Sequence, residues 1–348
     1  MFRFLLFPIA GVWSLFMLCR RRFYAIGKRK DSQISSICVG NLCMGGSGKT
    51  PHVEYLLNLL KDNYKTAALS RGYGRKTKGF LFATPNSTSE AIGDEPLQLY
   101  KKHAETTVAV CEDRVEGLRR ILEEVPDTDV VILDDAYQYL QMKYSLSIIL
   151  TDYYLIYPQD YVFPVGKLRE SALAAKEADI IVVTKSPNVM PELDRQLFLE
   201  KLKPLPHQKV YFSYMEYGQL QPLTKAAQAI DLQSIRSVVS VSGIANPYSF
   251  LKHIDNQYRE TQHLTFADHH VFKNKDIEKV IDAYNRAIMR SQAVITTEKD
   301  AMRLMTSDLW QMIAHLPVFT LPIVVKFHEK QRKELENQVK RVLKIKKI

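Results

Sequence analysis

The sequence predicts an α/β protein whose larger part is a mostly parallel sheet of the P-loop kinase type. Three observations support this prediction. Short apolar runs alternate with helical patterns, a glycine-rich segment ending in Lys49 and Thr50 follows the first run, and Asp134 and Asp135 follow a later one. Such runs are typical of parallel strands covered by helices on both faces. At 348 residues the chain exceeds what one core usually organises, so we expect two domains.

The first domain is expected over residues 31–207. Its predicted strands are the apolar runs Ile34–Val39, Thr66–Leu69, Thr107–Cys111, Val130–Leu133, Leu146–Leu150 and Ile180–Val183. Its predicted helices are Val53–Leu60, Glu95–His103, Arg114–Glu124 and a stretch near Ser171–Glu177. Ligands of such sheets bind beyond the carboxyl ends of the strands, so we expect the site in the loops that follow these runs.

The segment after the first run has the sequence form of a phosphate-binding loop. It consists of Gly45, Gly46, Ser47, Gly48, Lys49 and Thr50, and Cys43 stands where the strict pattern has glycine. The glycines let successive backbone N–H groups point at one oxyanion, the lysine reaches the outer phosphates, and the threonine hydroxyl can hold Mg²⁺. A glycine-rich turn without a nucleotide is the alternative, but the order of strand, turn, Lys-Thr and helix favours a nucleoside triphosphate.

The carboxylates Asp134 and Asp135 end the apolar run Val130–Leu133. In P-loop enzymes an acid at this place holds Mg²⁺, directly or through water, because the metal must bridge the outer phosphates. A pair of aspartates after a strand is alternatively turn chemistry. Downstream of a phosphate loop, the metal interpretation is favoured.

A second, smaller α/β unit is expected over residues 223–316, with strand-like runs at Ser237–Val241 and Ala293–Thr296. Two extended runs flank this unit, Gln208–Tyr217 and Val318–Val325. They predict a two-stranded β linker, with residues 208–222 as its first strand. Residues 317–348 are then the second linker strand and a charged C-terminal helix.

The N-terminal residues 1–30 are expected to form a hydrophobic helix followed by a basic cluster. No charge occurs from Phe4 to Cys19, and arginines and lysines follow closely. At about 1.5 Å per residue such a helix is shorter than the roughly 30 Å hydrocarbon core, so we do not expect it to span a bilayer. One interpretation is a buried helix. We favour a segment that dips into the bilayer while the basic cluster meets anionic headgroups.

Composition limits the partners. The formal charge of +10 favours an anionic partner: nucleic acid, a phospholipid surface or a phosphorylated substrate. The positive residues gather beside the N-terminal helix and at the C-terminal tail, without the interleaved aromatic residues that single strands require, so nucleic acid is disfavoured. No obligate protein partner is evident. The four cysteines have no metal-ligand or paired spacing, which suits a reducing cytosol.

Other candidate residues stand in turn-like contexts. Asp94, in Gly93-Asp94-Glu95-Pro96, can cap a helix or act in catalysis. His269, in Asp268-His269-His270, is suited to orient or shuttle a proton, and metal ligation by the histidine pair is weakly indicated. Arg71, Arg114 and Arg169 can match phosphate oxygens or be ordinary surface residues.

Together these motifs resemble the tetraacyldisaccharide 4′-kinase family, the lipid A 4′-kinases of Gram-negative bacteria. The resemblance is carried, in order along nearly the whole chain, by the hydrophobic N-terminus, Val39-Gly40-Asn41-Leu42 and the phosphate loop, Ser70-Arg71-Gly72-Tyr73-Gly74, Gly93-Asp94-Glu95-Pro96, Leu133-Asp134-Asp135, Leu168-Arg169-Glu170, Gly243-Ile244-Ala245-Asn246-Pro247, Asp268-His269-His270 and Thr297-Glu298-Lys299-Asp300. It implies transfer of the γ-phosphate of ATP to the 4′-hydroxyl of an acylated glucosamine disaccharide 1-phosphate at the cytoplasmic face of the inner membrane. It also implies two α/β/α sandwich domains, a two-stranded β linker and a site in the cleft between them.

The resemblance further implies roles for single residues. Lys49 binds phosphate, Thr50 binds Mg²⁺ with Asp134 and Asp135 near the metal, and Asp94 is the base, assisted by His269. Arg71, Arg114, Arg169 and Glu170 are implied to bind substrate in the cleft. The chain departs from the family where Tyr139 replaces the usual histidine after Asp134-Asp135-Ala136-Tyr137-Gln138.

A P-loop ATPase or GTPase switch at the membrane surface is the alternative function. Guanine specificity normally needs an Asn/Thr-Lys-x-Asp sequence after a late strand, and here Thr184-Lys185-Ser186-Pro187 lacks the aspartate. Partition-type ATPases place a second lysine early in the loop, where this chain has Met44. Both absences favour the kinase.

Overall fold

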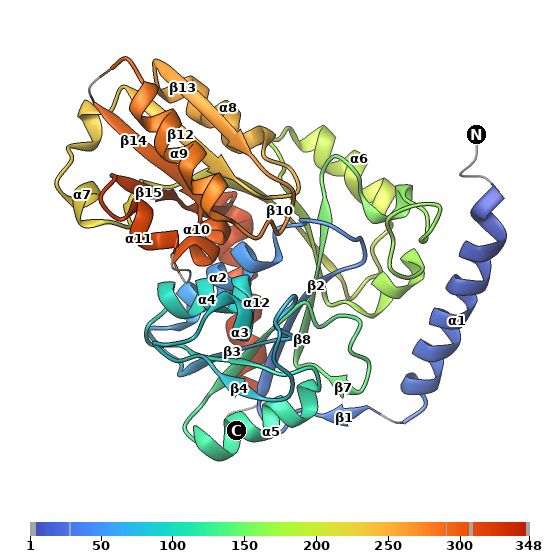
Figure 1. Cartoon of the computed structure of the whole chain (residues 1–348). Coiled ribbons are helices and arrows are strands. Elements are labelled where there is room, and N and C mark those ends of the chain that lie inside the picture. Colours follow the sequence, from blue (N-terminus) through green and yellow to red (C-terminus); the bar gives the residue numbers. More distant parts are fainter. Residues whose placement is uncertain (1–4, 28, 290, 306–308, 346–348) are drawn as a thin grey trace.

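We analysed a computed structural model of the chain, which describes residues 5–27, 29–289, 291–305 and 309–345. Three parts of the expectations lie outside the described residues: Phe4 at the start of the apolar segment, Lys28 within the basic cluster, and Lys347 near the end of the charged tail. The protein is of mixed α/β type and contains two large sheets whose strands run mostly parallel (Figure 1).

The larger sheet has nine strands in the order β16-β10-β9-β8-β2-β6-β3-β5-β4. All neighbouring pairs in it are parallel except the outermost pair at each edge, β16 with β10 and β5 with β4. Its strands are β2 (Ser35–Asn41), β3 (Thr66–Ser70), β4 (Leu81–Phe82), β5 (Thr107–Val110), β6 (Val130–Asp134), β8 (Leu146–Asp152), β9 (Ile180–Thr184), β10 (Lys209–Tyr217) and β16 (Ile323–Phe327). A short separate pair, β1 (Lys30–Asp31) with β7 (Met142–Lys143), lies beside it.

Helices cover both faces of this sheet because its inner strands are apolar on both sides. In β2, Cys38 packs into the cluster that contains α5 (Arg114–Glu124) and the short helix η3 (Ala172–Glu177). Ile37 and Val39 pack on the other face, against α2 (Lys49–Leu60), α4 (Asp94–Lys102) and α12 (Glu329–Ile345). The alternation along one strand therefore fixes which helix covers which face.

The predicted strands of the first unit are confirmed within one or two residues. The helix after the phosphate loop is the main difference, since it begins at Lys49 and not at Val53. Gly48, at a φ of 82°, turns the chain directly into the helix. Pro51 is tolerated there because the first turn of a helix has no intrahelical acceptor for its N–H groups.

The smaller sheet has five strands in the order β11-β15-β14-β12-β13. Its strands are β11 (Gln221–Pro222), β12 (Ser237–Ser242), β13 (Glu260–Thr265), β14 (Gln292–Thr297) and β15 (Val318–Leu321). The accompanying helices are α7 (Lys225–Gln228), α8 (Tyr248–Gln257), α9 (Asn274–Arg286), α10 (Glu298–Met305) and α11 (Leu309–Ile313). Two hydrophobic clusters hold these elements together, with α9 in one and α8 in the other.

Two extended passes connect the sheets. The first runs from β10 to β11, and the second runs back from β15 to β16; the backbone N–H of Gly218 donates to the carbonyl of Pro322 at 2.9 Å where they cross. The extended run expected over Val318–Val325 is present as extended backbone, and Pro322 divides it into β15 and β16, which belong to different sheets. A proline has no N–H to donate to a strand ladder, so it marks the point of transfer.

The N-terminal helix α1 (Phe7–Ala25) lies along one side of the molecule (Figure 1). Along it only Ala10, Met17 and Arg21 are buried. Arg21 makes a bidentate ion pair with Glu170, with closest nitrogen–oxygen distances of 2.9 Å. Among the described residues, none of the helices has the length and apolar character needed to cross a membrane.

Helices α4 and α10 bring the two sheets into contact. Buried apolar side chains from both helices and from the neighbouring α3 (Ser89–Ile92) and β5 form one cluster, made of Ile92, Leu97, Val110, Ala301 and Met302. Because α4 follows β3 and α10 follows β14 in the chain, this contact joins the loops at the carboxyl ends of both sheets.

Candidate active site

The phosphate-binding loop connects β2 to α2. Gly45 and Gly48 adopt positive φ angles of 117° and 82°, which side chains other than glycine rarely reach. The side-chain amide of Asn41, the last residue of β2, donates to the Ser47 hydroxyl at 2.8 Å. Lys49 opens the helix, and its ammonium lies 3.5 Å from the Asn41 amide oxygen. The predicted loop residues thus stand at a helix N-terminus, where backbone N–H groups favour an anion.

A buried histidine, His52, supports the loop from behind. Its Nδ1 lies 2.7 Å from the carbonyl oxygen of Gly48, and its Nε2 lies 2.9 Å from the Ser213 hydroxyl on β10. A carbonyl can only accept, so Nδ1 carries the proton and Nε2 accepts from Ser213. Burial lowers the pKa of His52 to about 4, so the ring is neutral at physiological pH. The imidazole therefore couples the loop to the strand that leads to the smaller sheet.

The predicted metal carboxylates follow β6. Asp135 adopts a φ of 48° and its carboxylate lies 3.6 Å from the Lys49 ammonium. The Arg169 guanidinium donates to both oxygens of the same carboxylate, at 3.0 and 3.1 Å. The structure therefore brings together Lys49, Asp135 and Arg169, three of the residues singled out in the sequence.

Asp134 is the unusual member of the pair. It is buried, and within the described chain neither carboxylate oxygen has a hydrogen-bond partner. Burial, together with the charges of Glu95 and Asp135, raises its pKa to about 7 despite the opposing charges of Lys49 and Lys299. A buried carboxylate without a partner is costly, which makes it a candidate for a ligand that the protein itself does not supply.

The residues present fit Mg²⁺. Asp134 and the buried Thr50 offer oxygen ligands, which this hard cation prefers. The described part of the chain contains no cluster of three or more His, Cys, Asp or Glu side chains suited to hold a metal. Mg²⁺ does not require one, because it usually takes one or two carboxylates together with substrate phosphates and water.

Asp94 is the first residue of α4 and meets side chains of the smaller sheet. Its Oδ2 accepts from Arg303 of α10 at 2.7 Å and lies 3.3 Å from Nδ1 of His269. Burial opposes the charged form of Asp94, but the hydrogen bonds from His269 and Arg303 outweigh it and hold its pKa below the usual value. His269 reaches this place through a φ of 56° in the loop after β13.

Further ion pairs surround Asp94. Glu95 accepts from Lys299 at 2.5 Å, and Arg303 donates to Asp300 at 2.8 Å. Asp300 is fully buried and also accepts from the backbone of Gly243 at 2.9 Å. Asp94 and Glu95 of α4 are therefore paired with Arg303 and Lys299 of α10, and these ion pairs join the two sheets.

Comparison with known proteins agrees with this site. A family model described as tetraacyldisaccharide-1-P 4′-kinase matches residues 2–344 of the chain. The chain belongs to this family. Proteins named tetraacyldisaccharide 4′-kinase from Parabacteroides distasonis and Bacteroides thetaiotaomicron are 40% and 35% identical to it over 347 residues. These alignments cover 96% of this chain and 94% and 91% of the relatives.

A solved structure of a family member has the same fold. LpxK from Aquifex aeolicus, determined in complex with ATP, superposes with a TM-score of 0.76 at 27% sequence identity. The alignment covers 99% of this chain and 100% of the other. The resemblance inferred from the motifs is thereby confirmed.

The predicted substrate-binding residues fall into different environments. Arg71 is exposed at the end of β3. Arg114 is buried and donates to the carbonyls of Cys111 and Glu112 at 3.2 and 3.0 Å, so its visible contacts hold the start of α5. Glu170 is bound by Arg21 of α1. The structure therefore places Arg169 beside Asp135 and gives Arg114 and Glu170 contacts within the protein.

Tyr139, the departure from the family pattern, points toward α5. Its hydroxyl donates to the Asp113 carboxylate at 2.6 Å, and Asp113 in turn caps α5 by accepting from the N–H groups of Val115 and Glu116. The Arg114 guanidinium lies 5.8 Å from the tyrosine ring centroid. These contacts give Tyr139 a role in holding the helix start.

Sequence reasoning missed three residues of the site: Glu95, Lys299 and Arg303. Asp300 and Arg303 are three residues apart on a short helix, so they share a face. This spacing was the only feature of the sequence that indicated a contact of Arg303. Their partners on α4 are about two hundred residues away in the sequence. Pairings over such separations cannot be read from local patterns.

We expect Asp94→Ala to lower turnover by roughly 10²–10⁴-fold, the usual loss when a positioned acid–base group is removed. Nucleotide affinity should stay close to wild type, because the phosphate loop is built on β2 and α2. Steady-state kinetics and equilibrium binding of an ATP analogue measure the two effects. Glu90→Ala, an exposed carboxylate on α3, is the control. Turnover near wild type would remove Asp94 from the mechanism.

Asp134→Asn should stabilise the protein in the absence of nucleotide while abolishing activity. The pKa of Asp134 rises from 3.8 to about 7 on folding, so its destabilising effect grows as pH rises through that window and is complete above it. The melting temperature of the variant should therefore exceed that of the wild type, and the difference should increase as pH rises from about 4 to about 7. Thermal denaturation at a series of pH values tests this, and an unchanged margin would contradict it.

Proposed function

We propose that this protein transfers the γ-phosphoryl group of ATP to the 4′-hydroxyl of tetraacyldisaccharide 1-phosphate, giving lipid IVA in lipid A biosynthesis. Family membership over residues 2–344 supports this function, as do the relatives named for it. The observation that carries the proposal is the contact between α4 and α10. This contact places Asp94 and His269 beside Glu95. The negative charge of Glu95 raises the pKa of the unpaired Asp134, and the next residue, Asp135, pairs with Lys49.

The phosphates of ATP would lie on the loop between β2 and α2. The N–H groups at the start of α2 and the Lys49 ammonium supply positive charge where the outer phosphates sit. Phosphoryl transfer needs positioning and charge neutralisation rather than a covalent intermediate. The Arg169 guanidinium, already bound to Asp135, is well placed to add to this charge.

Mg²⁺ is the proposed cofactor, held by Thr50 and Asp134 with Asp135 nearby. When bound, the ion would neutralise negative charge on the outer phosphates. Within the described chain neither carboxylate oxygen of Asp134 has a hydrogen-bond partner. A bound cation would compensate this buried negative charge, which supports the assignment. The ionised form of Asp134 would then be favoured at neutral pH.

Asp94 is the proposed acceptor of the hydroxyl proton. Its depressed pKa keeps the carboxylate ionised, so it can orient the attacking hydroxyl by hydrogen bonding from the start of the reaction. In a loose phosphoryl-transfer transition state the hydroxyl loses its proton late, so a weak base in the right position is sufficient. His269 and Arg303 hold that position.

We also propose that the protein rests on the cytoplasmic face of the inner membrane through α1. The helix exposes a series of large apolar side chains, namely Phe7, Ile9, Val12, Trp13, Leu15, Phe16 and Phe23. Exposed apolar surface of this extent marks an interaction site. The indole of Trp13 donates to the carbonyl of Arg169 at 2.9 Å, so the helix is attached to the segment that holds Asp135.

The two sheets are proposed to act as two domains, residues 31–207 and 223–316, joined by the passes within 208–222 and 317–348. Two extended segments of the described chain pass between the sheets, and Gly218 and Pro322 lie where these segments pair. In this arrangement His269 lies beside Asp94, where it would help to exclude water from bound ATP.

The decisive experiment is an assay of purified protein with ATP, Mg²⁺ and the acylated disaccharide 1-phosphate. We expect 4′-phosphorylated product and little ATP hydrolysis without acceptor. A folded protein that hydrolyses ATP or GTP equally well with and without acceptor, and forms no phosphorylated lipid, would instead be a switch. The Asp94→Ala variant serves as the inactive control.

Charges placed on the exposed face of α1 should weaken membrane binding. Val12 and Leu15 are 72% and 63% exposed, so Val12→Glu with Leu15→Glu should leave the fold intact. Sedimentation with anionic phospholipid vesicles should show a marked loss of binding. Leu193→Glu, at a position 67% exposed on α6 (Glu192–Leu202), is the matched control and should bind as wild type. Equal binding by all three proteins would refute the role of α1.

A further inference from the structure

The position of His269 is set by the loop that follows β13. Its side chain is 40% exposed, and its backbone has a φ of 56°, which is uncommon for a residue with a side chain. Its Nδ1 lies 3.3 Å from the carboxylate of Asp94 and 3.3 Å from the guanidinium of Arg303. A backbone conformation of this kind persists only where the surrounding structure holds it. The contacts of the loop therefore decide where the imidazole lies.

The next residue, His270, is held by a hydrogen bond and by ring contacts. Its Nε2 donates to the carboxylate of Asp276 at 2.9 Å. Its ring stacks on Phe266, with the centroids 4.7 Å apart, and meets Phe272 edge to face at 5.2 Å. Phe272 is buried in the core of the smaller sheet. His270 is therefore the residue that attaches the middle of the loop to this core.

Asp276 belongs to the first turn of α9 and is itself buried. The oxygen that accepts from His270 also accepts from the backbone N–H of Lys273, at 3.1 Å. Burial opposes the charged form, but these hydrogen bonds outweigh it and hold the pKa of Asp276 below its usual value, so the carboxylate is ionised at neutral pH. Helix α9 packs into the core through Ile277 and Val280. The acceptor for His270 therefore has a fixed place.

The loop is also in contact with Gly243, which follows β12. The backbone N–H of His269 donates to the Gly243 carbonyl at 3.2 Å, and the same carbonyl accepts from Arg303 at 3.0 Å. A Cβ atom at Gly243 would lie 3.3 Å from the Cβ of His270, so the two segments pack closely. A displacement of His270 would therefore move His269 relative to both Arg303 and Asp94.

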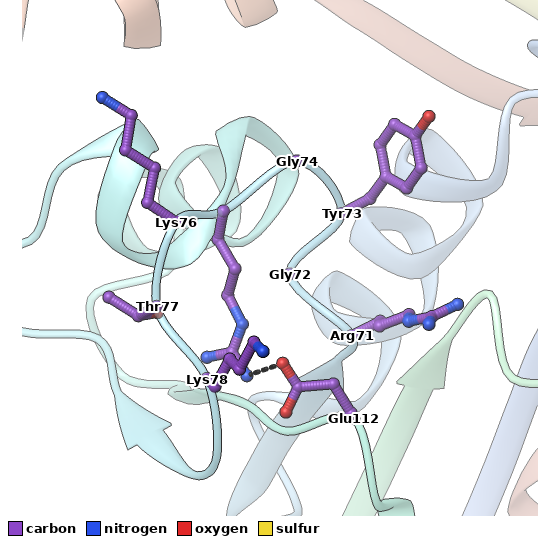
Figure 2. A pocket seen from close by; sticks show the side chains of 9 residues that line it. Arg71, Gly72, Tyr73, Gly74, Lys76, Thr77, Lys78 and Glu112 are labelled. Atoms are coloured by element: carbon purple, nitrogen blue, oxygen red, sulfur yellow. Dashed lines mark hydrogen bonds and ion pairs between the residues drawn. The ribbon is translucent and has the colours of Figure 1, made fainter.

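The other sheet contacts the His269 ring through Tyr73. Tyr73 belongs to the loop after β3, which together with Glu112 lines an open pocket, and its side chain points away from Glu112 (Figure 2). The centroids of the Tyr73 and His269 rings are 5.6 Å apart. This contact reports the place of His269 without any measurement of activity.

We propose that the hydrogen bond from His270 to Asp276 positions His269, by holding the loop so that the imidazole stays against the carboxylate of Asp94. The inference rests on the proposed function and adds His270 and Asp276 to it as positioning residues. The two histidines contact different carboxylates, Asp94 and Asp276. This supports separate roles in one mechanism rather than joint binding of a metal ion.

The first test is steady-state kinetics with ATP and the acylated disaccharide 1-phosphate. His270→Phe keeps a ring for the stacking on Phe266 but removes the N–H donor. Its kcat should fall roughly 10–100-fold, since a shift of about 1 Å in a catalytic group can cost about 100-fold. His270→Gln offers an amide N–H in place of Nε2–H and should retain most of the turnover. The KM for ATP should not change in either variant, because the phosphate loop precedes α2 in the larger sheet.

The acceptor of the hydrogen bond has a matched control. Asp276→Ala should reduce kcat as much as His270→Phe does. Asp255 on α8 likewise accepts from a histidine, His263, at 2.9 Å, so Asp255→Ala removes the same kind of hydrogen bond elsewhere in the smaller sheet. Asp255→Ala should turn over as the wild type.

Two further measurements separate positioning from a general loss of stability. In a His269→Ala background, His270→Phe should cause no further loss of kcat, because the group that it positions is already absent. NMR of protein labelled in histidine and tyrosine should show a cross-peak between the Tyr73 and His269 rings in the wild type and in Asp255→Ala. This cross-peak should be lost in His270→Phe.

Wild-type turnover in both His270→Phe and Asp276→Ala overturns the inference. So do an equal loss in Asp255→Ala, an equal loss in His270→Gln and His270→Phe, a further loss in the His269→Ala background, and an unchanged cross-peak in His270→Phe. Failure of the proposed function is distinct, because the wild type would then form no phosphorylated lipid. The NMR comparison would still test the place of His269 in that case.

Discussion

The contact between α4 and α10 is the interaction on which the rest of the site depends. Arg303 and Lys299 on α10 bind Asp94 and Glu95 on α4, above a cluster of apolar side chains that includes Leu97 and Met302. Breaking one side of a buried ion pair is costly because it leaves an unpaired charge. The position of the smaller sheet and the orientation of the catalytic carboxylate are therefore fixed by the same bonds.

Beside this contact the protein keeps a charge that it does not neutralise. Asp134 is buried without a hydrogen-bond partner in the described chain, although Lys49 and Lys299 both act on it. An unpaired buried carboxylate is destabilising, and we propose that a bound cation compensates it. Arg75 likewise has buried N–H groups without acceptors in the described part of the chain.

Two peripheral elements lie beside the P-loop core. Helix α1 exposes a series of apolar side chains, and the loop after β3 carries Arg71, Arg75 and Lys78. Both are attached to the site by specific contacts, Trp13 to the Arg169 carbonyl and Tyr73 to His269. Both elements are therefore structurally linked to the candidate site.

The sequence alone determined the local chemistry of this protein. The strands β2, β3, β5, β6, β8 and β9, the phosphate loop, Asp134 at a strand end and the family itself could be predicted, because each depends on residues close together in the chain. Only the tertiary structure decided that Arg303 binds Asp94, that Pro322 moves the chain between sheets, and that Asp134 is unpaired. These features depend on packing between elements that are distant in sequence, and no local pattern records which distant side chains will meet.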